Sequence, residues 1–317
     1  MKSSVRAHLA IGFSSVIFGL NAPISKDVLS EGLSAEALIF LRVAFAAIAF
    51  GALSLFTKRE KVPLKDVGLL ALCGLFGVVF NQGFFLFGLA YTSSVDALIV
   101  TTITPVLVMC LAAIFLKEPI TGIKILGVIM GAVGALIIIL HTFINDALAC
   151  ESISCAFDLM KRHGDEPKGT VFGALLCFCS SLSYAIYLAI SKPLAAHYSS
   201  STIMCWMFLF AALGITPIGI WHVTGIQWSS LAPHVIPSVG YILFFATFIT
   251  YLCIGFSMRY LRPTTLSMYN YMQPLVASIA AILAMQDKFE WYKVFAAILI
   301  FGGVYVVTKS RARAKPY

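Results

Sequence analysis

Charge is what this sequence has least of. Only 11% of its 317 residues are Asp, Glu, Lys or Arg, whereas 60% are hydrophobic, and the mean hydropathy is +0.94. Ordinary soluble domains carry about 25% charged residues. A soluble domain of this length could not bury so much apolar surface, so the composition predicts an all-α integral membrane protein that crosses the bilayer several times.

The signatures of catalysis and of cofactor binding are missing as well. The sequence has no HExxH, Walker, GxGxxG or GxSxG motif, and its six histidines are scattered without a pair at metal-ligand spacing. The net charge of +8 comes from short loops and a basic tail, not from a basic stripe interleaved with aromatic residues. We predict that the protein is not an enzyme, needs no metal or cofactor, and does not bind nucleic acid.

Cysteine pairs outside apolar segments are equally scarce. Six of the eight cysteines fall in apolar segments, where a thiol usually acts as a small hydrophobic group, and only Cys150 and Cys155 share a loop. The sequence leaves open whether these two form a disulfide, because connectivity cannot be read from spacing.

Apolar stretches of spanning length are what the chain has in abundance. A bilayer core of roughly 30 Å needs about 20 apolar residues in one helix. Ten such spans are predicted, at 8–28, 35–56, 66–90, 94–116, 122–141, 170–191, 201–222, 235–258, 263–285 and 291–309. Five spans per half is an odd number, so the second half must enter the membrane the other way up, as in transporters built from inverted repeats.

The predicted domain organisation follows from these spans. A first five-helix repeat covers 1–141, an outer connecting loop covers 142–169, and a second five-helix repeat with a basic tail covers 170–317. Of the 22 lysines and arginines, 15 fall on the side of the N-terminus and six on the other side, with Arg42 inside a span. Positive residues mark the cytoplasmic side, so both termini are predicted to be cytoplasmic. The localisation that we predict is the bacterial inner (plasma) membrane, as a multi-pass protein.

The two halves also resemble each other in sequence. The stretch 88–121 recurs 169 residues later, which aligns Pro105 with Pro274 without a gap. A second match, at an offset of 166, aligns Lys26 with Lys192. Weak similarity between two halves of a membrane chain is typical of a duplicated transporter.

Polar side chains at mid-membrane depth are the candidates for a solute site. Such residues are costly in lipid and usually face the interior of a helix bundle. The alternative for each of them is that it only joins helices by hydrogen bonds. Because they include tyrosines and asparagines without a buried acidic array, we predict a cavity for a small polar or amphipathic organic solute. The predicted substrate-binding residues are Asn21, Arg42, Asn81, Gln82, Thr101, Tyr184, Tyr187, Tyr251, Tyr269, Asn270 and Gln273.

Two prolines are predicted to kink their spans at the centre. Pro105 and Pro274 cannot donate to the carbonyls four residues earlier, those of Thr101 and Asn270. A free carbonyl is costly in lipid, so each kink is expected to face protein or a water-filled cavity.

Four charged residues within or beside spans have two interpretations each. Arg42 would bind a substrate carboxylate through two parallel hydrogen bonds, or it would snorkel or pair structurally. Lys26 and Lys192 would close gates, Lys26 by pairing with Asp96, or they would be interfacial snorkelling lysines. Asp96 has a proton relay as a lesser interpretation.

The stretch AYTSSVDALIVTTITPVLVMCLAAIFLKEPIT resembles the EamA family of the drug/metabolite transporter superfamily. The resemblance depends on a small-residue helix start, a mid-helix proline and an acidic residue before the next span, which are here Ser94, Ala97, Pro105 and Glu118, followed by Thr121. It implies ten helices in two inverted repeats around a central site, and often the export of amino acids or related metabolites. Asp96 and the long loop depart from the family's usual pattern.

The predicted function is a secondary transporter that exports amino acids or related small metabolites by alternating access, with Pro105 and Pro274 as pivots. The alternatives are a broad exporter of amphipathic drugs and a membrane binding or scaffold protein that transports nothing. The expected partners are a small solute and membrane lipid, with a possible homodimer through the fifth and tenth helices. This last expectation comes from small-residue faces at Gly127, Gly131 and Gly134, and less cleanly at Gly302 and Gly303.

Overall fold

The computed structural model describes residues 2–57, 60–91, 94–148, 170–226, 228, 231–283 and 291–310. All regular secondary structure in these ranges is helical, and no strand occurs within them. Seven helices are long and apolar enough to cross a membrane: Ser3–Ser30, Ala35–Leu55, Leu64–Tyr91, Phe172–His197, Ser200–Thr224, Val235–Tyr260 and Trp291–Lys309. The chain is therefore an all-helical, multi-pass membrane protein.

The first half contains a series of α-helices with one π-helix, η1. They are α1 (Lys2–Ser30), α2 (Ala35–Leu55), α3 (Leu64–Gly74), η1 (Leu75–Phe80), α4 (Asn81–Tyr91), α5 (Ser94–Thr101), α6 (Thr104–Leu116) and α7 (Gly122–Leu148). α7 continues past residue 141, where the fifth span was predicted to end, into the stretch predicted as a loop. Cys150 and Cys155 lie outside the described residues.

The second half has a π-helix, η3, and a 3-10 turn, η4, between its α-helices. Its elements are α9 (Thr170–His197), α10 (Ser200–Thr224), α11 (Val235–Leu243), η3 (Phe244–Ile249), α12 (Thr250–Tyr260), α13 (Pro263–Met268), η4 (Tyr269–Tyr271), α14 (Met272–Leu283) and α15 (Trp291–Lys309). Helix is present in each of the ten predicted stretches, although the ten-span topology itself remains a prediction.

Irregular backbone recurs at matching positions in the two halves. The π-helices η1 and η3 begin and end 169 residues apart, and so do the α-helices that follow them, α4 and α12. π-helices are rare, and they occur mostly as short insertions within α-helices near functional sites. The coincidence places the same local distortion before the same segment in each half.

The starts of α2 and α10 also correspond. Each helix begins after a serine N-cap in extended conformation, Ser34 and Ser199, whose side chain accepts from the N–H three residues later. This hydrogen bond satisfies one of the helix's unpaired N–H groups. The two N-cap serines can therefore be used to align α2 with α10 when positions in the two halves are compared.

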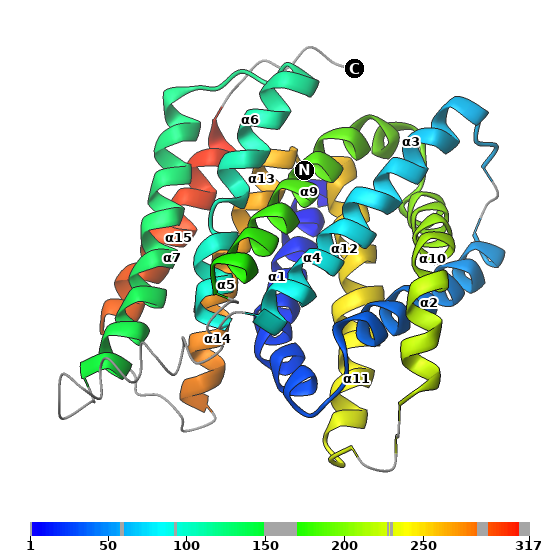
Figure 1. The fold of residues 1–317 in the computed structure, drawn as a ribbon. Helices are drawn as coiled ribbons and strands as arrows, with labels where there is room; N and C mark the ends of the chain where they lie inside the picture. Colours follow the sequence, from blue (N-terminus) through cyan, green and yellow to red (C-terminus); the bar gives the residue numbers. More distant parts are fainter. Residues whose placement is uncertain are drawn as a thin grey trace.

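The halves pack through each other rather than side by side. α1 packs on α12 and α14, whereas α9 packs on α4 and α6. α2 pairs with α10 at one side of the molecule and α7 pairs with α15 at the other, with α1, α4, α9 and α12 between them (Figure 1). The space at the centre is therefore enclosed by helices from both halves.

The glycine face of α7 is used inside the chain. A Cβ on Gly127 would lie 2.8 Å from the Gly303 carbonyl oxygen, and one on Gly134 would lie 2.8 Å from that of Ala296. These glycines let α7 and α15 approach closely, as small residues do in membrane bundles. A homodimer through these helices, which stays a prediction, would need their outward residues instead.

Candidate functional site

A cavity of about 100 Å³ lies between the two halves. Fourteen residues line it, and they come from α1, α2, α4, α5, α6, α9, α12, η4 and α14. Twelve are polar, and among these lining residues Arg42 is the one that carries a charge. The full set is Phe18, Asn21, Arg42, Asn81, Gln82, Phe85, Thr101, Thr104, Ser180, Ser181, Tyr184, Tyr251, Asn270 and Gln273.

The cavity brings together nine of the eleven residues predicted to bind a solute. The two that do not line it are Tyr187 and Tyr269. Tyr187 is completely buried, and its ring lies so close to Gly77 that a Cβ there would be 2.6 Å from it. The Tyr269 hydroxyl instead makes a 2.8 Å hydrogen bond with Nδ1 of His8. Solute binding by the nine lining residues remains a prediction.

Five lining residues were not predicted: Phe18, Phe85, Thr104, Ser180 and Ser181. The repeat itself held the signal for two of them. Phe18 lies 166 positions before Tyr184, and Thr104 lies 169 positions before Gln273, and both of these partners had been predicted. Carrying each candidate over to the other half would have found them.

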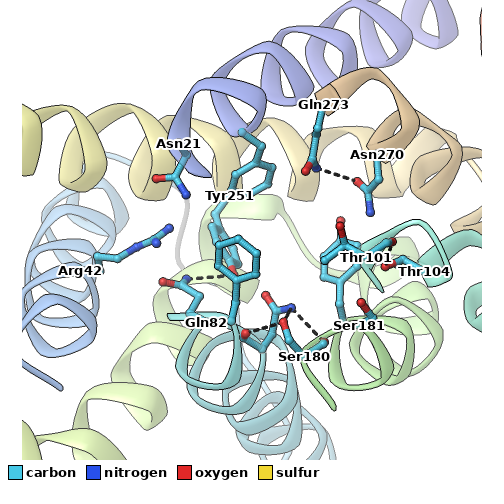
Figure 2. A pocket seen from close by; sticks show the side chains of 14 residues that line it. Asn21, Arg42, Gln82, Thr101, Thr104, Ser180, Ser181, Tyr251, Asn270 and Gln273 are labelled. Atoms are coloured by element: carbon cyan, nitrogen blue, oxygen red, sulfur yellow. Dashed lines mark hydrogen bonds between the residues drawn. The ribbon is translucent and has the colours of Figure 1, made fainter. Parts of the chain in front are cut away.

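Gln82 and Tyr251 lie 169 positions apart in the sequence and touch each other in the cavity wall. Gln82 Nε2 donates to the Tyr251 hydroxyl at 3.0 Å (Figure 2). That hydroxyl donates to the Gly77 carbonyl of η1 at 2.6 Å. Because the single tyrosine proton goes to Gly77, the tyrosine oxygen must accept from the amide, which fixes the amide's orientation. The other amide atom, Gln82 Oε1, is buried and has no hydrogen-bond partner among the residues that the structure describes.

Arg42 reaches the cavity from α2 and is only 2% exposed. Its Nε donates to Thr247 Oγ1 at 2.9 Å and its Nη2 to the Ala246 carbonyl at 3.3 Å, both in η3. Ala246 lies 169 positions after Gly77, so the same position of each π-helix accepts a hydrogen bond from a cavity side chain. Figure 2 shows the guanidinium pointing toward the space that Asn21 and Gln82 also face.

Asn81 contributes to helix pairing as well as to the cavity wall. Its Nδ2 donates to the carbonyl and to Oγ of Ser180, each at 3.1 Å, and Ser180 Oγ donates back to the Asn81 carbonyl at 2.7 Å. This reciprocal pair joins α4 to α9. The alternative interpretation, that a polar side chain joins two helices by hydrogen bonds, therefore describes contacts that Asn81 makes.

Irregular backbone precedes both prolines, as a break in the helix before Pro105 and as a 3-10 turn before Pro274. α5 ends at Thr101 and α6 begins at Thr104, so Pro105 stands in the first turn of a new helix rather than inside a kinked one. The Thr101 carbonyl, predicted to be free, accepts from Thr104 Oγ1 at 2.7 Å. Pro274 follows the 3-10 turn η4.

The two lysines predicted as gates make equivalent hydrogen bonds. Lys26 Nζ donates to the Leu89 carbonyl at 2.8 Å, and Lys192 Nζ donates to the carbonyls of Met258 at 2.7 Å and Leu261 at 2.8 Å. Leu89 and Met258 are 169 positions apart near the ends of α4 and α12, where a cation favours the helix dipole. The side chain of Asp96, the predicted partner of Lys26, lies outside the described residues.

Comparison with known proteins identifies the family. The model of the EamA-like transporter family matches residues 5–140 and 171–309. The chain belongs to the EamA-like transporter family. An "uncharacterized transporter" of Archaeoglobus fulgidus is 25% identical over 279 residues, which is 88% of this chain and 90% of that protein. A WAT1-related protein of Arabidopsis thaliana is 24% identical over 321 residues, covering 97% and 86% of the two chains.

The fold of this EamA-like transporter also matches a solved crystal structure. The TM-score is 0.70 at 16% identity, over 96% of this chain and 99% of the other. The match of the family model confirms the family named from the sequence motif. Membership in a family of transporters agrees with the prediction that the chain is not an enzyme.

Proposed function

We propose that this EamA-like transporter is a secondary transporter that exports amino acids or related small polar or amphipathic metabolites by alternating access. The observation that carries the proposal is the central cavity. It is lined from both halves, at positions that correspond, and two of those positions, Gln82 and Tyr251, contact each other. Transporters built from inverted repeats hold their substrate at such a repeat interface.

The hydrogen bonds at one end of the bundle support a closed gate there. Near the start of α1, Ser257 Oγ of α12 donates to the Ala7 carbonyl at 2.8 Å. The corresponding position in the other half is Gly88, which packs against Gly173 and Cys177 without a hydroxyl. Rocking about the breaks before Pro105 and Pro274 would exchange the two ends between open and closed arrangements.

The charge of the cavity argues against the broad exporter of amphipathic drugs when those drugs are cations. Arg42 would repel a lipophilic cation, and none of the described lining residues is a carboxylate that could attract it. A scaffold protein without transport activity predicts instead that cavity substitutions change nothing outside the cell.

Comparative metabolite profiling tests the proposal. Cells that express the wild type, Asn270→Ala or the lipid-facing control Ile298→Ala at matched levels would be compared for solutes inside and outside. We expect one class of solute to accumulate outside with the wild type and with Ile298→Ala, whose side chain is 64% exposed, and to do so less with Asn270→Ala.

Identical profiles for all three strains and for cells without the protein would contradict export. Uptake into proteoliposomes would then show whether the direction of transport was wrong or whether no transport occurs.

A further inference from the structure

We infer that the solute reaches the cavity as an organic anion, with its acid group on Arg42 and a neighbouring hydroxyl or N–H group donating to Gln82. The inference rests on the proposed transport function and names the charge and the recognition pattern of its substrate. Its basis is a set of polar atoms on one side of the cavity whose hydrogen-bonding capacity is not fully used.

The first observation is the incomplete pairing of Arg42. A guanidinium has five N–H donors, and the two hydrogen bonds of Arg42 both go to neutral oxygens, those of Thr247 and Ala246. No carboxylate pairs with it in the described part of the chain. A buried charge without a counter-ion is costly, and a ligand carboxylate that accepts two parallel N–H bonds would supply one.

The other half of the chain shows that the docking of this helix does not require an arginine. Arg42 lies eight positions after the N-cap Ser34, and Met207 lies eight positions after the N-cap Ser199. Met207 is completely buried, and its carbonyl packs against Gly74 of α3, so α10 docks beside η1 as α2 docks beside η3. Docking at this place is therefore achieved without a cation in one of the two halves.

The second observation is the orphaned acceptor, Gln82 Oε1. The hydrogen bonds through Tyr251 to Gly77 hold the amide so that Oε1 is buried and finds no partner in the described part of the chain. In Figure 2 this end of Gln82 lies on the same side of the cavity as the Arg42 guanidinium. An anion bound there would be repelled by Oε1 unless the ligand also presents a donor next to its acid group.

Together these atoms describe an acid with an adjacent donor, such as a 2-hydroxy acid or an N-acylated amino acid. A free ammonium group would lie near Arg42 and would find no carboxylate among the described lining residues. Acids without an ammonium group are therefore expected to bind better than zwitterionic amino acids of the same shape. Phe18 and Phe85 provide apolar surface for the remainder of the solute.

The test uses the purified full-length chain and three probes of one shape: L-3-phenyllactate, its amide L-3-phenyllactamide, and L-phenylalanine. The measurement is the shift of the unfolding temperature with each probe at matched ionic strength. For the wild type we expect the largest shift with phenyllactate, and for Arg42→Met we expect the acid and the amide to become equivalent. Without any probe, Arg42→Met is expected to unfold at the same or a higher temperature, as Met207 does the equivalent packing.

Gln82→Glu is a second variant that keeps the test decisive if Arg42→Met does not fold. It would place a carboxylate beside Arg42 and is expected to remove the shift with phenyllactate while preserving the guanidinium. Equal shifts for the acid and the amide, no shift with any probe, or an undiminished preference for the acid in Gln82→Glu would each overturn the inference.

The two proposals fail separately. If export depends on Asn270 but the exported solutes are neutral or cationic, the transport function stands and the inference of an anionic substrate is wrong. A preference for phenyllactate that depends on Arg42, in a protein that moves no solute across liposomes, would do the opposite.

Discussion

The two halves of this chain share their backbone irregularities but not the side chains that use them. At matching positions in the π-helices, the Gly77 carbonyl accepts from a tyrosine and the Ala246 carbonyl accepts from Arg42. At another pair of matching positions, one half has Gln82 and the other has Tyr251, and the two side chains are hydrogen-bonded to each other. The shared backbone builds the cavity, and the differences between the halves make it chemically one-sided.

The largest effect is expected when the charge of the first half is copied into the second. Met207 is completely buried, so Met207→Arg would bury a guanidinium with no partner prepared for it. An uncompensated buried charge costs about 3–5 kcal/mol, which predicts a large loss of folded protein in a thermal unfolding assay. Met207→Leu, a substitution of similar volume, is the control and is expected to cost less than about 1.5 kcal/mol. Wild-type stability of Met207→Arg would show that this position tolerates a charge in either half.

A smaller effect is expected when the serine of one gate is copied to the other. Gly88 lies 169 positions before Ser257, and its Cβ would be 2.6 Å from Cys177 Sγ and 2.9 Å from the Gly173 carbonyl oxygen. Gly88→Ser is therefore expected to separate α4 from α9 and to destabilise the protein by about 1–3 kcal/mol. Gly68→Ser, where a Cβ meets nothing within 4 Å, is the control. Comparable unfolding temperatures for the two variants would mean that α4 and α9 can move apart freely.

An effect of similar size, on the balance between open and closed ends rather than on folding, is expected from removing either lysine tether. A hydrogen bond to a charged group contributes about 1.5–3 kcal/mol, so Lys192→Met would shift the balance between open and closed ends about tenfold or more. Lys26→Met is expected to shift it in the opposite direction, because Lys26 binds α4 at the other end of the bundle. Labelling a Ser180→Cys reporter in the cavity from each side of the membrane would measure this. Shifts in the same direction would contradict the assignment of the two lysines to opposite gates.

The sequence predicted the helices and most of the cavity because both depend on local composition. Polar residues such as Asn21 and Gln82 stand out in apolar spans, and burial in lipid leaves them little choice but to face the interior. The family followed from the motif around Pro105. The missing N–H of each proline predicted a kink, whereas Pro105 stands in the first turn of a new helix and Thr104, a protein group, satisfies the Thr101 carbonyl.

The differences between the predicted and the observed cavity lining come from rotation of the helices about their axes. Tyr184 and Tyr187 were predicted to share one site, yet Tyr184 lines the cavity whereas Tyr187 packs on Gly77. Which tyrosine faces inward depends on the partner helix, and no local pattern records that.

The paired π-helices have a consequence for sequence alignment and for engineering. A π-helix amounts to one residue inserted into an α-helix, and one residue corresponds to about 100° of turn. Deleting a residue within Leu75–Phe80 would restore regular helix and swing α4 around its axis, carrying Gln82 away from the cavity. Each π-helix thus determines which side chains of the following helix face the cavity. A sequence alignment that omits the extra residue would assign the wrong side chains to the cavity.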